Sequence, residues 1–217
     1  MNQLEFANVT LLLLSLVLSA VFFLSWLIFD RQKHALTWSI CFGVAAAWSF
    51  DNIAGGAGWI PYNLYCSSAN FIGLAVPVLA LLGYIQRANF HLSISSIIGL
   101  ILIPFFIAMW ATYVQPYFGI RAFALPFQNL IISIWTIRII YLSNKLLSKI
   151  EWAIICSYVL LAFNQTWLGA IALSNGPDRI EQIAAFYDLV FFISVPSFFT
   201  ILSHLFFYLF YFLFFSF

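Results

Sequence analysis

Long runs of apolar residues, separated by short polar stretches, follow one another along the whole chain. A membrane hydrocarbon core of about 30 Å is crossed by about 20 apolar residues in a helix. Runs of this length predict membrane-spanning helices at about 8–29, 36–54, 66–86, 93–113, 119–142, 151–174 and 183–203. The runs are continuous rather than alternating, which favours helices over a membrane β-barrel.

The polar stretches between these runs are short and rich in turn-forming residues, as in 30–34, 55–61 and 174–178. They leave no room for a linker or a second soluble domain. The sequence therefore predicts an all-α membrane protein with one domain, 1–203, made of seven helices. The remaining segment, 204–217, is an apolar tail of mostly Phe, Leu and Tyr. It is either the out-of-frame end of a truncated or frameshifted longer protein, or an aromatic segment along the inner membrane surface.

Composition agrees with a lipid environment, because 65% of the residues are apolar and only 7% are charged. A soluble domain carries about 25% charged residues. The net charge of +1 gives no indication of a nucleic-acid partner. The three cysteines are far apart and no CxxC or HExxH pattern occurs, so we expect no metal. No lysine follows Lys149 to hold retinal, and the histidines do not favour haem, so we expect no cofactor.

Basic residues predict the orientation of the chain. Most of them fall at the same end of the predicted bundle: Arg31, Lys33, Arg87, Arg138, Lys145 and Lys149. Arg121 and Arg179 fall at the other end. The positive-inside rule then places the N-terminus outside and the C-terminus in the cytoplasm. Tryptophans are expected in two interfacial belts, with Trp26, Trp38, Trp135 and Trp152 at the inner one and Trp48, Trp59, Trp110 and Trp167 at the outer one.

Polar side chains within the spans are the candidate site, because such residues are costly in lipid and face the bundle interior. Most lie in the predicted outer half: Asp51, Asn70, Arg121, Gln128, Gln165 and Asp188. One interpretation is a pocket for an unknown small-molecule signal, with Arg121 paired to Asp51 or Asp188. Another is a set of hydrogen bonds that hold the helices together. Arg121 and Asp51 could also extend toward the membrane surface without pairing.

Two motifs resemble a known family. The first polar turn, Asp30–His34, is followed by Ala35-Leu36-Thr37-Trp38 and later by Ala47-Trp48. The second is Trp110-Ala111-Thr112-Tyr113-Val114-Gln115-Pro116, with Arg121 shortly after. Over about 8–203 the chain resembles the amino-terminal membrane region that precedes the GGDEF domain of bacterial diguanylate cyclases.

The resemblance implies a sensory module of the bacterial inner membrane that regulates synthesis of cyclic di-GMP. The sequence holds no GGDEF motif, so we expect no catalytic residue in this chain. Expected partners are the lipid bilayer, the unknown signal and, as one candidate, a second copy of the chain. A small seven-helix transporter for a polar metabolite is the alternative function. Prolines at positions 77, 104, 126 and 196 would bend the helices of a sensor or of a transporter.

Overall fold

The computed structural model describes residues 3–29, 31–115, 117–143 and 149–174. These residues form six helices and no strand: α1 (Gln3–Ile28), α2 (Lys33–Gly56), α3 (Tyr62–Arg87), α4 (Ile94–Tyr113), α5 (Phe118–Ser143) and α6 (Lys149–Ser174). The first six predicted ranges each coincide with one of them. Most helices are longer than predicted, because the helix continues into the polar residues that flank each apolar run. The seventh predicted helix, with Asp188, and the tail 204–217 lie outside the described residues.

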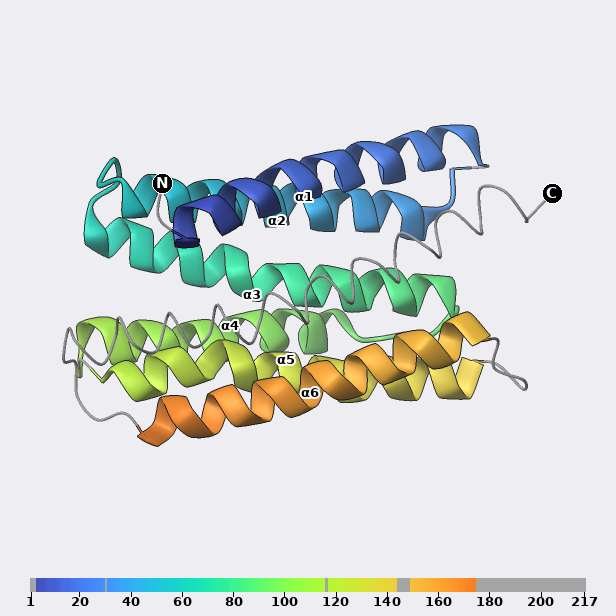
Figure 1. Cartoon of the computed structure of the whole chain (residues 1–217). Helices are drawn as coiled ribbons and strands as arrows, with labels where there is room; N and C mark the ends of the chain where they lie inside the picture. The colour runs from blue at the N-terminus through green and yellow to red at the C-terminus, as the bar shows by residue number, and fades with distance from the viewer. Residues whose placement is uncertain (1–2, 30, 116, 144–148, 175–217) are drawn as a thin grey trace.

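The helices lie side by side and alternate in direction (Figure 1). Each connection is short, which makes consecutive helices antiparallel neighbours. Helix α1 packs on α2, and α6 packs on α5. Helix α3 contacts α2, α4 and α5 and is the central element. We call the end with Arg31, Lys33 and Arg87 the basic end, and the opposite end, where α1 starts, the N-terminal end.

Five of the six helices, α1 and α3 to α6, are long and apolar enough to cross a membrane. In length and composition these helices are those expected of a multi-pass membrane protein. Helix α2 is not among the five, so the span at 36–54 stays a prediction. Many of its residues are buried between neighbours, including the polar Thr37, Ser49 and Asp51. A helix that neighbours shield from lipid needs fewer apolar residues, which accounts for the polar character of α2.

Two serines join α1 to α2. Ser19 Oγ donates to the carbonyl of Ser39, and Ser39 Oγ donates to the carbonyl of Ser19, both at 2.9 Å. Gly43 lies near the same contact, because a Cβ there would be 3.5 Å from Ser19 Oγ. Small residues of this kind let membrane helices approach closely.

Tryptophan rings of α2 pack on glycines of α3. A Cβ at Gly83 would overlap Nε1 of Trp38, and a Cβ at Gly73 would lie 3.0 Å from Nε1 of Trp48. The two contacts run antiparallel along the helices and fix their register. Trp38 is only 4% exposed, so its predicted place in an interfacial belt is wrong. The ring is in the core because Gly83 leaves space for it.

Five tryptophans have exposed rings, as the predicted interfacial belts require: Trp59, Trp110, Trp135, Trp152 and Trp167.

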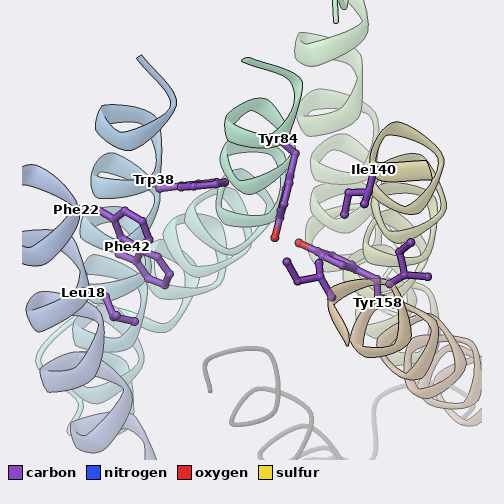
Figure 2. Close-up of a cluster of buried hydrophobic side chains, with 9 residues drawn as sticks. Leu18, Phe22, Trp38, Phe42, Tyr84, Ile140 and Tyr158 are labelled. Carbon is purple, nitrogen blue, oxygen red and sulfur yellow. The ribbon is translucent and has the colours of Figure 1, made fainter. Parts of the chain in front are cut away.

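The main buried cluster lies around Trp38 (Figure 2). Phe22 of α1 lies edge-on to Trp38 and parallel to Phe42, with ring centroids 5.4 and 5.5 Å away. Tyr84 of α3 contacts Trp38 on one side and Tyr158 of α6 on the other, at 5.4 and 5.9 Å. The hydroxyl ends of the two tyrosines point toward each other (Figure 2). This chain of rings connects α1 and α2 to α6 through α3.

Candidate functional site

Asp51 is held at the N-terminal end of the bundle. The residue is 7% exposed, and Ser68 Oγ on α3 lies 2.9 and 3.1 Å from its two carboxylate oxygens. Next to it, Tyr65 Oη donates to the side-chain oxygen of Asn52 at 3.0 Å. A buried carboxylate is costly unless hydrogen-bonded, so Ser68 stabilises Asp51 and joins the end of α2 to the start of α3.

Asn70 lies on α3 but does not join this contact. Its side-chain nitrogen donates to the carbonyl of Cys66 in the same helix at 2.6 Å. The guanidinium of Arg121 in α5 lies 5.5 Å from the centroid of the Phe118 ring. Among the contacts of the described residues, the Asp51 carboxylate accepts from the Ser68 hydroxyl and the Arg121 guanidinium lies over the Phe118 ring, so the predicted pair of Arg121 with Asp51 stays a prediction. The other predicted partner, Asp188, lies outside the described residues.

Tyr113 connects α4 to α3 at the same end. Its hydroxyl is 2.6 Å from the carbonyl of Asn63 and 2.6 Å from Ser67 Oγ. The neighbouring Thr112 donates to Ala108 within α4. Tyr113 belongs to the second motif of the sequence, but its position did not indicate which helix it contacts.

Gln128 of α5 is completely buried and contacts two other helices. Its Nε2 donates to the carbonyl of Leu74 in α3 at 2.9 Å and to the carbonyl of Leu100 in α4 at 2.6 Å. All three residues lie near the middle of their helices. Gln165 of α6 is buried as well, and it accepts from Asn129 of α5 at 3.5 Å, the long limit of a hydrogen bond.

The basic end holds a second polar group, which the sequence did not single out. Arg87 of α3 lies 3.9 Å from the carboxylate of Glu151 at the start of α6. Thr37 of α2 donates to the side-chain oxygen of Gln86 at 2.7 Å. Charged residues at helix ends usually face water, so their positions gave no signal of this contact. Nearby, burial and then the charge of Arg87 lower the pKa of His34.

A cavity of about 220 Å³ opens beside this ion pair. Its polar lining comes from Tyr84, Arg87, Asn89 and Glu151, and its apolar lining includes isoleucines of α5 and α6.

In chemical terms, most of these polar side chains join helices. In the part of the chain that the structure describes, no three His, Cys, Asp or Glu side chains gather into a set that could hold a metal ion. The three cysteines are free, and Cys41 Sγ lies 3.3 Å from the carbonyl of Val76 in α3. The contacts of Asp51 and Gln128 agree with the interpretation of the site residues as interhelical hydrogen bonds.

No family model, curated protein or solved structure matches this chain. Its function is therefore argued from its own residues and their contacts.

Proposed function

We propose that this chain is the signal-input module of a membrane signalling protein, similar to the module that precedes bacterial GGDEF domains. In this proposal seven helices span the inner membrane, the N-terminus is outside, and the last helix leads into the cytoplasm. A small-molecule signal acts at the N-terminal end of the bundle. The response is a change in cyclic di-GMP synthesis by a cytoplasmic domain.

The observation that carries the proposal is the set of contacts made by α3. At the N-terminal end, Ser68 holds Asp51 of α2 and Ser67 contacts Tyr113 of α4. At the basic end, Arg87 is paired with Glu151 of α6. With 26 residues, α3 is about 39 Å long at 1.5 Å per residue.

Because α3 is one continuous helix between the two ends, a shift at its N-terminal end can be passed along it to its basic end. Helix α3 therefore offers a physical connection between a signal on one side of the membrane and α6 on the other. The motif residues support the same proposal, since Trp38 and Trp48 pack on α3 and Tyr113 bonds to it.

The test is a fusion of this chain to a GGDEF reporter domain in bacteria that lack other diguanylate cyclases, with cyclic di-GMP as the readout. Ser68→Ala and Arg87→Gln each remove a contact of α3 and should change the cyclic di-GMP level. Thr166→Ala is the matched control, because the Thr166 hydroxyl bonds within its own helix, to Ala162. If Ser68→Ala and Arg87→Gln match the control at equal protein levels, the proposal fails. A C-terminal reporter found outside the cell would also refute it.

Transport of a polar metabolite is the second candidate, and Gln128 is the observation that favours it. Transporter sites lie near the membrane midplane, between bent helices. Gln128 lies at mid-helix and contacts two helices that contain Pro77 and Pro104. Uptake of a labelled metabolite into liposomes containing the purified chain, abolished by Gln128→Met, would favour transport over signalling.

A further inference from the structure

Helix α4 contains a proline at its centre. Pro104 is buried and lies inside Ile94–Tyr113. In a regular α-helix the N–H of residue 104 would donate to the carbonyl of residue 100. Proline has no N–H, so the carbonyl of Leu100 lacks this donor. In a membrane no water replaces it, and an unpaired carbonyl costs several kcal/mol there.

A side chain from another helix supplies a donor to this carbonyl. Gln128 Nε2 of α5 lies 2.6 Å from the carbonyl oxygen of Leu100. The same nitrogen lies 2.9 Å from the carbonyl oxygen of Leu74. Both neighbours are acceptors, so the amide nitrogen, and not the amide oxygen, must face them. The two hydrogens of one NH₂ group satisfy the two carbonyls.

We propose that Gln128 is the substitute hydrogen-bond donor for the carbonyl that Pro104 leaves without its helical partner, and that it holds this part of α4 against α3. Leu74 is 1% exposed and precedes Pro77 by three residues. The amide therefore holds α3 near its own proline and α4 one turn before Pro104. Because one side chain bonds both backbone carbonyls, α3 and α4 are held at the same point of α5.

The other amide atom agrees with this assignment. Gln128 Oε1 is buried and has no hydrogen-bond partner among the described residues. A buried acceptor without a partner is unfavourable, so the amide oxygen does not account for the position of this side chain. Its two short donor bonds are what hold it in this position.

A double-mutant cycle between Gln128 and Pro104 tests the proposal. The readout is the unfolding equilibrium of the purified full chain in mixed micelles, titrated with SDS. Gln128→Met keeps the length of the side chain but removes the donor. We expect it to shift the equilibrium toward the unfolded state by roughly threefold to tenfold. In the Pro104→Ala background the shift should be clearly smaller, because the backbone N–H of an alanine at position 104 can donate to the carbonyl of Leu100.

Pro126→Ala is the matched control. Pro126 lies inside α5 and removes the helical donor for the carbonyl of Ala122, whereas the amide of Gln128 donates to Leu74 and Leu100. The effect of Gln128→Met should be the same in the original chain and in the Pro126→Ala background. An equal effect of Gln128→Met in the original chain and in the Pro104→Ala background would overturn the proposal. If Gln128→Met does not fold, Gln128→Asn takes its place, since its amide is one methylene shorter and cannot reach both carbonyls.

Discussion

Gly83 should not tolerate even one added methyl group. A Cβ at this position would overlap Nε1 of Trp38 and lie 2.5 Å from Cδ1 and 2.9 Å from Cε2. Carbon atoms in contact are normally about 3.5–4.0 Å apart, so the ring would have to move by at least about 1 Å. Trp38 is confined by Phe22, His34 and Tyr84, each with its ring centroid 5.4 Å away.

The two opposing effects of Gly83→Ala can be compared. Overpacking of a core costs about 1–3 kcal/mol. Alanine stabilises a helix by about 1 kcal/mol relative to glycine. Because Trp38 is held on several sides, we expect the upper part of the first range and a net loss of about 2 kcal/mol in the free energy of unfolding. The assay is SDS titration of the purified chain in mixed micelles, followed by far-UV circular dichroism.

Gly99→Ala is the matched control within α4. A Cβ at Gly99 would be 3.8 Å from Cδ1 of Ile103, an ordinary contact, so this variant should be as stable as the original or slightly more so. A third variant, Trp38→Leu, removes the ring. In that background Gly83→Ala should cost nothing. If Gly83→Ala is as stable as Gly99→Ala, or if its cost persists in the Trp38→Leu background, the packing argument is refuted.

Three further predictions concern polar contacts. Ser68→Ala removes the hydroxyl beside the buried Asp51 carboxylate and should lower the free energy of unfolding by about 1–3 kcal/mol, with a smaller loss when Asp51→Asn is also present. Ser39→Ala should lower it by about 0.6 kcal/mol, and a double-mutant cycle should show coupling to Ser19→Ala, because the two serines bond reciprocally. The pKa of His34 is lowered from 6.5 in the folded chain, so the unfolded chain binds this proton more tightly. Stability is thus fully present above pH 6.5 and falls as the pH drops toward the folded-state pKa, and His34→Gln should reduce this dependence in thermal unfolding at about pH 5–7.5.

The positions of the helices could be predicted because they depend on local properties. An apolar run of membrane length forms a helix whatever its neighbours are, and the first six predicted ranges are helices. The burial of Trp38 could not be predicted in the same way. It depends on Gly83 in another helix, and an isolated tryptophan near a helix end is typical of an interfacial position.

The candidate site was predictable in composition but not in pairing. Asp51, Gln128 and Gln165 are buried, as polar residues within spans should be. Their partners are a hydroxyl, two backbone carbonyls and an amide. Every residue has a backbone carbonyl, so the sequence could not indicate which ones Gln128 would find. Charge attraction suggested Arg121 for Asp51, whereas the hydrogen-bond donor that the structure places at its carboxylate is the Ser68 hydroxyl of the adjacent helix.

The packing of tryptophan on glycine also has an evolutionary consequence. Position 83 can gain a side chain only if position 38 loses volume. Positions 73 and 48 are restricted in the same way but less strictly, because a Cβ at Gly73 would be 3.0 Å from the Trp48 ring. In an alignment of related chains, the residues at 38 and 83 should therefore change together, with a small residue at 38 wherever 83 is larger than glycine. A deletion of one residue between 73 and 83 would rotate one glycine away from its ring, so we expect the spacing of these two positions to be invariant.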